Sequence, residues 1–162
     1  ARMKALFYRN LSGLATLADD GGFEIDALGG APGIKSHRWA SAGDGEDEDE
    51  ALIAYTMERL RGVPIQKRSA RLTVVVALAL PDGSIYTAHE SVQGVVPLVA
   101  SSKRTKGFPY RSLLYLPEIG KFYDHTELTN EETEKYNHRK KALETLKPVI
   151  WEALYRSHEL EE

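Results

Sequence analysis

The sequence has 162 residues, with 42% hydrophobic and 28% charged side chains, which is ordinary for one globular domain. Its net charge of -3 gives no sign of a nucleic-acid-binding surface, and no apolar run approaches the roughly 20 residues that a membrane helix needs. The absence of cysteine excludes a disulfide framework, a thiolate metal site and a cysteine nucleophile. We therefore expect a single domain over residues 1–162 in the reducing cytoplasm, with neither nucleic acid nor a membrane as partner.

The N-terminal stretch predicts a helix over residues 1–12, because apolar residues recur there at helical spacing and a glycine follows. Residues 14–18 then predict a short strand that ends at Asp19 and Asp20, and two glycines separate it from a small strand over 23–25. Two carboxylates at a strand end can bind a divalent metal or take a proton from water. A solvated turn is the alternative, since Asp and Gly are common turn residues.

The run that includes the Asp pair carries the strongest signal in the chain. It reads Ala-Asp-Asp-Gly-Gly-Phe-Glu-Ile-Asp-Ala-Leu-Gly-Gly-Ala-Pro-Gly over 18–33 and continues as Ile-Lys-Ser-His-Arg-Trp-Ala over 34–40. This run resembles the signature of the inosine/xanthosine triphosphate pyrophosphatases, which hydrolyse non-standard purine nucleoside triphosphates. That family opens with a strand and a Thr/Ser-x-Asn-x-x-Lys phosphate loop. No counterpart precedes Ala1 in this sequence, so we expect a divergent member lacking that N-terminal phosphate loop.

The middle of the chain predicts one helix and a long hairpin. The acidic run over 43–50 is expected to be a solvated loop and the start of a helix that continues to about Arg61, since acids favour a helix N-terminus. Residues 71–80 predict a buried strand, and residues 84–96 predict a second long strand after a Pro-Asp-Gly turn. Gly94 indicates a bulge or a bend in that second strand.

The loop over 101–107 is basic, and its three cations beside a glycine can clamp phosphates, with a solvated surface loop as the equal alternative. Residues 108–112 stand where the family has Phe-Gly-Tyr/Trp-Asp-Pro, so the resemblance implies that Phe108 stacks on the purine. Tyr110 is retained, but Arg111 replaces the acid that helps to read the base. Because a guanidinium group only donates hydrogen bonds, base selectivity is expected to differ.

Residues 113–116 predict a short strand and 117–125 a loop, and a capping box at Thr129 and Glu132 opens a last long helix that Pro148 kinks or restarts. On this helix, Asn137-His138-Arg139 resembles the family's Ser-His-Arg, whose His and Arg contact the purine. Composition alone favours a solvated basic face there. Thr133 stands where the family has a phosphate-binding Lys.

The resemblance implies an α/β fold: a mixed, elongated, twisted β-sheet with flanking helices that form two lobes around a nucleotide cleft. It implies Mg²⁺-dependent hydrolysis of ITP, XTP and dITP to the monophosphate and pyrophosphate. Asp20 is the predicted catalytic base, and Asp19 and Asp20 are the predicted metal ligands. The predicted substrate contacts are Gly21, Lys35, Ser36, Arg38, Phe108, Tyr110, His138 and Arg139.

The family is commonly dimeric, so a homodimer is expected, with a purine nucleoside triphosphate as the substrate. Lys35, Lys103, Arg104 and Lys106 are candidates to replace the family's two principal phosphate-binding lysines, for which this sequence has no counterpart. The alternative hypothesis is a catalytically impaired member that acts as a nucleotide-binding or interaction protein, because a fold does not imply its function.

Overall fold

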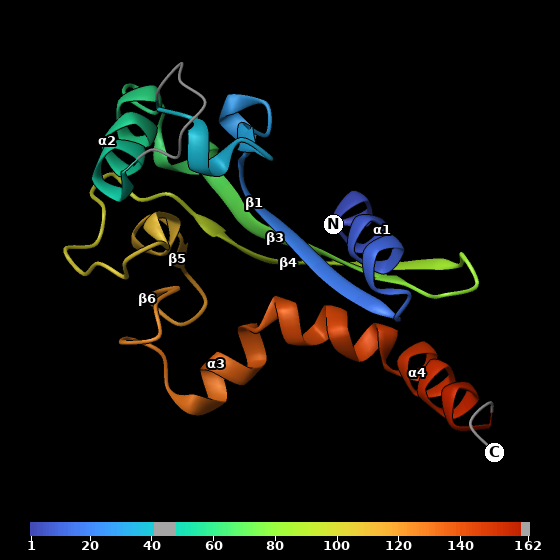
Figure 1. Ribbon diagram of the computed structural model, residues 1–162. Coiled ribbons are helices and arrows are strands. Elements are labelled where there is room, and N and C mark those ends of the chain that lie inside the picture. The colour runs from blue at the N-terminus through green and yellow to red at the C-terminus, as the bar shows by residue number, and fades with distance from the viewer. Residues whose placement is uncertain (41–47, 160–162) are drawn as a thin grey trace. The chain divides into compact units, whose positions relative to one another are not determined.

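The computed structural model of the chain describes residues 1–40 and 48–159 and combines helices with one β-sheet (Figure 1). The helices are α1 (Arg2–Ser12), α2 (Asp49–Arg59), α3 (Asn130–Tyr136) and α4 (His138–Glu159). The strands are β1 (Thr16–Ile25), β2 (Pro32–Gly33), β3 (Ser69–Ala79), β4 (Ile85–Val95), β5 (Tyr115–Leu116) and β6 (Lys121–Phe122). They form a six-stranded sheet in the order β2-β1-β3-β4-β5-β6.

The predicted α/β class is confirmed, with one difference in the direction of the strands. The pairs β1–β2, β4–β5 and β5–β6 are antiparallel, with Phe23 opposite Gly33 and Val95 opposite Tyr115. The strands β3 and β4 form the predicted hairpin, which is antiparallel because a tight turn joins them. Strands β1 and β3 also run in opposite directions, since Gly22 contacts Thr73 and Glu24 contacts Arg71. The sheet is therefore antiparallel, where the sequence predicted one of mixed direction.

The chain folds into two compact units, each built from separate stretches of sequence. The first unit holds residues 1–20, 74–91 and 137–162, and the second holds residues 21–73 and 92–136. The boundary falls inside each of the three long strands, β1, β3 and β4. In the described part of the chain, no helix combines the length and the apolar character that crossing a membrane requires.

In the first unit, α1 and α4 cover opposite faces of the sheet (Figure 1). Val76 and Leu78 of β3 belong to the apolar cluster that includes α4, whereas Ala77 and Ala79 pack with Ala5 of α1. This division follows from the strand itself, because successive side chains point to opposite faces of a sheet. The apolar run that predicted a buried strand is thus covered on both sides.

Helix α1 confirms the predicted helix but buries a different face from the one that its apolar spacing indicates. It ends at Gly13, whose φ of 71° is the left-handed conformation common after a helix. Ala5 is fully buried, whereas Met3, Phe7 and Leu11 are 85%, 58% and 70% exposed. The opposing positions of β3 are alanines, so the small side of the helix packs on the sheet.

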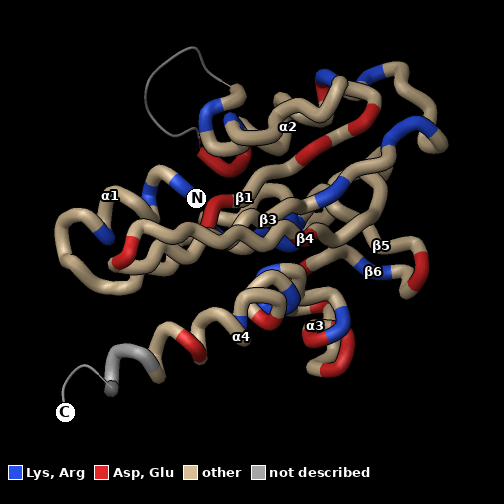
Figure 2. The backbone as a smooth tube through the Cα atoms, turned by 90° about the vertical axis from the view of Figure 1, so that its right-hand side faces the viewer, with Lys and Arg blue, Asp and Glu red and all other residues tan. Residues whose placement is uncertain are grey.

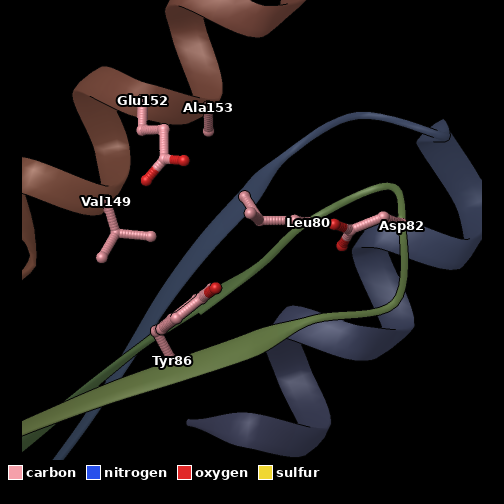
Figure 3. Close-up of a pocket in the computed structure, with 6 residues that line it drawn as sticks. All are labelled: Leu80, Asp82, Tyr86, Val149, Glu152 and Ala153. Atoms are coloured by element: carbon pink, nitrogen blue, oxygen red, sulfur yellow. The ribbon is translucent and has the colours of Figure 1, made fainter.

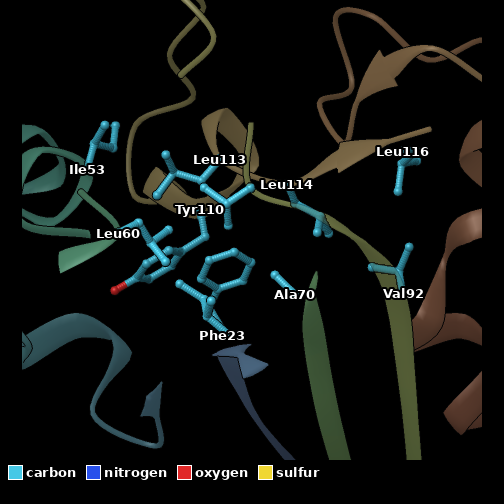
Figure 4. Packing of buried hydrophobic residues seen from close by; sticks show 11 residues of the cluster. Phe23, Ile53, Leu60, Ala70, Val92, Tyr110, Leu113, Leu114 and Leu116 are labelled. Atoms are coloured by element: carbon cyan, nitrogen blue, oxygen red, sulfur yellow. The ribbon is translucent and has the colours of Figure 1, made fainter. Parts of the chain in front are cut away.

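The second unit has its own core, drawn in Figure 4, where α2 and the turn over 109–112 pack against the strands. At its centre Phe23 of β1 stacks on Tyr110, with ring centroids 4.7 Å apart and planes inclined by 26°. The fully buried members include Leu60, Leu113 and Leu114. This core holds the end of β1 that follows the Asp pair.

The two strands predicted around the glycine pair are one continuous strand, β1. Gly21 and Gly22 therefore do not end a strand. A Cβ on Gly22 would lie 2.6 Å from the carbonyl oxygen of Gly33 on β2, so only glycine permits this close approach. Gly94, predicted as a bulge or bend, has a similar role, because a Cβ there would overlap the carbonyl oxygen of Tyr115.

The C-terminal helical region divides at Asn137 and not at Pro148. The predicted capping box opens α3, with the Thr129 N–H donating to Glu132 Oε2 at 2.8 Å and the Glu132 N–H donating to Thr129 Oγ1 at 3.2 Å. Asn137 Oδ1 accepts the Lys140 N–H at 2.9 Å and so caps a new helix, α4. Pro148 lies inside α4, which continues to Glu159.

Candidate functional site

The Asp pair lies in the middle of β1, in the first unit, and its two side chains leave the strand on opposite faces. Asp19 Oδ2 accepts a hydrogen bond from Arg139 Nε of α4 at 2.6 Å. Asp20 Oδ1 lies 3.7 Å from Lys4 Nζ of α1, and its side chain is 54% exposed. The prediction that a strand ends at the Asp pair is wrong, because β1 continues to Ile25. The two carboxylates therefore lie apart: Asp19 faces α4 and Asp20 faces α1.

His138 and Arg139 stand in the first turn of α4, whereas the sequence placed them on a helix that opens at the capping box of Thr129. The N-terminus of a helix carries a partial positive charge, which Arg139 increases. The acidic part of β1 and the basic start of α4 are coloured in Figure 2, and the Asp19–Arg139 ion pair joins them. Arg139 is half-exposed, with 52% of its side-chain surface accessible.

The groups around the Asp pair fit magnesium better than a metal that needs a full protein cage. Among the described residues, no three His, Asp or Glu side chains gather in a way that can hold a metal ion. Mg²⁺ is usually held by one or two carboxylates together with substrate phosphates and water. The exposed carboxylate of Asp20 is a donor of that kind, so the residues present fit a magnesium ion that arrives with a phosphorylated ligand.

In the second unit, two predicted substrate contacts are buried and bonded within the chain. The hydroxyl of Ser36 accepts the Phe23 N–H at 2.9 Å and donates to the carbonyl oxygen of Gly33. The hydroxyl of Tyr110 donates to the carbonyl oxygen of Ser36 at 2.6 Å. Only 4% of Ser36 and 5% of Tyr110 is exposed, so we correct their role: they hold the glycine-rich turn in place.

The other predicted contacts of the second unit differ in accessibility. Lys35 and Arg38 flank the buried Ser36 and have exposed side chains. Gly21 lies within β1, where a Cβ would meet the carbonyl oxygen of Thr73 at 3.0 Å. Phe108 is 48% exposed, so its ring can stack on a ligand. Lys35, Arg38 and Phe108 thus remain available for binding.

Arg111, which stands where the family motif has an acidic residue, lies over the ring of Phe108. Its guanidinium carbon is 4.3 Å from the ring centroid, a cation–π arrangement. Its Nη1 is also 3.3 Å from His125 Nδ1. The spacing of three residues between Phe108 and Arg111 was the available signal, because residues three apart lie above one another in a 3₁₀ turn.

The basic loop over 101–107 is held by carboxylates. Arg104 pairs with Glu50, and Lys103 Nζ lies 3.7 Å from Glu127 Oε1. The Gly107 N–H donates to Asp49 Oδ2 at 2.7 Å. The acidic run therefore opens α2 as predicted and also binds this loop, although its residues 43–47 lie outside the described chain. A phosphate would have to replace these carboxylates to be clamped here.

A small hollow lies between the β3–β4 turn and α4 in the first unit (Figure 3). Its volume of about 60 Å³ is enough for a few water molecules and not for a nucleotide. None of the predicted site residues lines it. The lining residues are Leu80, Asp82, Tyr86, Val149, Glu152 and Ala153.

The first unit thus carries an exposed carboxylate and a cationic helix start. The second unit carries an exposed aromatic ring with nearby cations. The sequence profile of the Ham1 family matches residues 1–149. The chain belongs to the Ham1 family.

Similar proteins agree with this assignment. A dITP/XTP pyrophosphatase of Thermus thermophilus is 39% identical over 146 residues, which are 90% of this chain and 67% of the relative. A dITP/XTP pyrophosphatase of Desulforamulus reducens is 40% identical over 148 residues, 91% of this chain and 70% of the relative. The HAM1 protein of Coxiella burnetii has a similar structure, with a TM-score of 0.77, 31% identity, and coverage of 93% of this chain and 74% of that one.

A second solved structure, the Ham1 protein of Staphylococcus aureus, has a TM-score of 0.77 at 27% identity and covers 91% of this chain and 72% of that one. The chain therefore spans between two thirds and three quarters of the length of these four proteins.

Proposed function

We propose that this protein hydrolyses non-standard purine nucleoside triphosphates, namely dITP, ITP and XTP, to the monophosphate and pyrophosphate. The observation that carries the proposal is the similarity of nine tenths of the chain to dITP/XTP pyrophosphatases at 39–40% identity. The exposed carboxylate on β1 and the cations at the start of α4 support it, because such groups can activate water and bind phosphates or polar base edges.

Asp20 is the proposed catalytic base. Its half-exposed carboxylate can accept a proton from the water that attacks the α-phosphorus, after which pyrophosphate leaves. A bound Mg²⁺ neutralises charge on the phosphate oxygens and helps to orient the triphosphate. We propose that Asp20 holds this ion, because its carboxylate is half-exposed and lies 3.7 Å from Lys4 Nζ, whereas Asp19 accepts a hydrogen bond of 2.6 Å from Arg139.

His138 and Arg139 are proposed to select the base. Arg139 can only donate hydrogen bonds, and the 6-oxo group of hypoxanthine or xanthine accepts them. Adenine presents an amino donor at the same position, so it would leave the donors of the protein unpaired. The ion pair with Asp19 supports this role because it restricts the guanidinium group of Arg139 before any ligand binds.

In the second unit, Phe108 is proposed to stack on the purine, and the exposed Lys35 and Arg38 are proposed to bind phosphate oxygens. These roles are assigned from exposure and chemistry. Ser36 and Tyr110 support them indirectly, by holding the turn that carries Lys35 and Arg38.

The test is pyrophosphate release with Mg²⁺ from ITP, XTP, dITP, GTP and ATP, by the parent and by Asp20→Asn. We expect preference for ITP, XTP and dITP, and a loss of at least about 100-fold in kcat in Asp20→Asn, the scale of general base catalysis. No release from any of the five, by a folded protein that still binds inosine triphosphate, would instead favour a non-catalytic nucleotide-binding protein.

Asp19→Asn is the matched variant, because it removes the neighbouring carboxylate of the same strand. If Asp19 acts as the partner of Arg139, this variant raises the KM for ITP and weakens the preference over ATP, while the Mg²⁺ concentration at half-maximal rate is unchanged. A rise in that Mg²⁺ concentration would show that Asp19 is a metal ligand, as the sequence predicted.

A homodimer is also proposed. Met3, Phe7 and Leu11 expose an apolar stripe on α1, and exposed apolar patches often mark protein interfaces. Analytical ultracentrifugation of the parent and of a Phe7→Lys, Leu11→Lys variant tests this. A monomeric parent, or a variant that dimerises as well as the parent, would contradict the proposal for this surface.

A further inference from the structure

Asp124 is a buried carboxylate that the proposed chemistry does not use. Only 2% of it is exposed, and it lies in the second unit between β6 and α3. Its Oδ1 accepts two hydrogen bonds from Thr126, from Oγ1 at 2.6 Å and from the backbone N–H at 2.9 Å. Its Oδ2 accepts a hydrogen bond from Thr105 Oγ1 at 2.6 Å.

The bond to Thr105 leads to the proposed base-stacking residue. Thr105 lies 19 residues before Asp124 in the loop over 101–107. Its carbonyl oxygen accepts the backbone N–H of Phe108 at 2.9 Å. Two consecutive hydrogen bonds therefore connect the buried carboxylate to the backbone of Phe108.

A second connection runs from Phe108 through Arg111 to the turn over 124–126, which contains Asp124. Arg111 lies over the Phe108 ring at 4.3 Å, and its Nη1 is 3.3 Å from Nδ1 of His125, the residue after Asp124. The backbone N–H of Arg111 also donates to the carbonyl oxygen of Phe108 at 3.2 Å. Phe108 is thus attached to the turn over 124–126 through Thr105 before it and through Arg111 after it.

We propose that Asp124 is a positioning residue for base recognition, which holds Phe108, through Thr105, in the orientation that stacks on the purine. The proposal rests on the proposed function, in which Phe108 is the stacking residue. Gly107, directly before this ring, is the residue type with the greatest backbone freedom, so hydrogen bonds of the neighbouring residues are what restrict Phe108. An aromatic ring held in place before binding loses less conformational entropy when the base arrives.

Two valine variants and one serine variant distinguish a role in positioning Phe108 from a general effect on stability. Thr105→Val has nearly the same shape as the parent but lacks the hydroxyl that binds Asp124 Oδ2. Thr105→Ser restores that hydroxyl. Thr126→Val is the matched control, since it removes a hydroxyl at the same 2.6 Å distance from the other carboxylate oxygen, to which Thr105 does not donate.

We expect Thr105→Val to raise the KM for ITP about tenfold with kcat within about twofold, the equivalent of about 1.4 kcal/mol in binding. Thr105→Ser should return the KM to within about twofold of the parent, and Thr126→Val should leave it there, even if both valine variants lower the melting temperature. An unchanged KM in Thr105→Val, or an equal rise in both valine variants, would overturn the proposal.

A second measurement does not depend on activity. Backbone hydrogen exchange at Phe108 in the free protein should be about tenfold faster in Thr105→Val than in the parent, and unchanged in Thr126→Val. If the parent releases no pyrophosphate, the proposed function fails while this measurement still reports whether Asp124 holds Phe108. Equal exchange at Phe108 in all variants would show that it does not.

Discussion

Several buried polar groups of this protein have their hydrogen bonds satisfied by residues distant in the sequence. Asp124 receives a bond from Thr105, and Ser36 receives bonds from Phe23 and Tyr110. An unpaired polar group in the interior costs more than a formed hydrogen bond gains, so these contacts determine which loops stay fixed. Substitutions of two buried groups, Asp124 and Arg68, should therefore lower the stability of the protein measurably.

Asp124 predicts a loss of stability in acid. Burial raises the pKa of its carboxyl, but the hydrogen bonds from Thr105 and Thr126 lower it further, to about 2, from an ordinary value of 3.8. A folded-state pKa below the unfolded one gives stability that is present above pH 4 and is lost as the pH falls towards 2. The unfolding free energy should fall by about 2 kcal/mol more in the parent than in Asp124→Asn between pH 5 and pH 2.

Urea denaturation of the parent and of Asp124→Asn at pH 5, 4, 3 and 2 measures this difference. The other carboxyls titrate equally in both proteins, so the comparison isolates Asp124. Parallel losses in the two proteins would contradict the prediction.

Arg68 predicts a large loss of stability when its guanidinium group is removed. It is 4% exposed and donates to three carbonyl oxygens, of Leu60 at 2.7 Å, of Val63 at 2.9 Å and of Pro97 at 3.0 Å. Arg68→Met removes the guanidinium donor from all three carbonyls, of which that of Leu60 keeps the backbone N–H of Val63, so we expect a loss of about 3 kcal/mol in unfolding free energy.

Arg61→Met is the control for Arg68→Met. The side chain of Arg61 is 78% exposed and, among the residues that the structure describes, pairs with Glu58 at the surface, so its removal should cost less than about 0.5 kcal/mol. Chemical denaturation of both variants gives the two values. Similar losses in the two would show that the bonds of Arg68 to the carbonyls contribute little.

At the scale of the element, the position of a residue along its helix or strand decides its chemical role. In the middle of β1 the two adjacent carboxylates must face α4 and α1 separately, whereas at a strand end they can converge. The helix break at Asn137 likewise moves His138 and Arg139 from a solvated helix face to a helix N-terminus. That position favours negatively charged groups.

Asn137 is expected to stabilise the start of α4 by capping it. Asn137→Ala removes the side-chain oxygen that accepts the Lys140 N–H, so the unfolding free energy should fall by about 1 kcal/mol. Asn137→Ser and Asn137→Asp keep an oxygen in that position and should stay within about 0.5 kcal/mol of the parent. Denaturation curves for the three variants test this, and an equal loss in all three would argue against a capping role.

At the scale of the whole molecule, the division into two units raises the question of whether they fold independently. The boundary passes through β1, β3 and β4, so neither unit has a complete set of strands by itself. We therefore propose that residues 1–162 form one cooperative domain, as the sequence led us to expect.

Calorimetry tests this cooperativity. One heat-absorption peak is expected, with the calorimetric enthalpy equal to the van't Hoff enthalpy, which is the signature of two-state unfolding. A further check uses Arg68→Met, in the second unit, and Asn137→Ala, in the first: each should lower the temperature of the same single transition. Two resolved peaks, each shifted by one variant only, would show two domains.

Local patterns in the sequence predicted the elements that depend on neighbouring residues. The hairpin of β3 and β4, the helix stop at Gly13 and the capping box at Thr129 all depend on backbone conformation within a few residues. The run over 18–40 also indicated the family directly, because its order of residues is specific. Boundaries were less accurate where a strand passes through glycines, as in β1.

Only the tertiary structure decided which side chains are available for a ligand. Tyr110 and Phe108 are both aromatic and only two residues apart, yet Tyr110 stacks on Phe23 in the core while Phe108 is half exposed. The partners of Asp19 and Asp124 lie 120 and 19 residues away. Turns, caps and strand patterns depend on neighbouring residues, so the sequence by itself determined the elements and the family. The exposure and the pairing of a side chain depend on segments that are distant in the sequence. For that physical reason only the tertiary structure decided the contacts of the site.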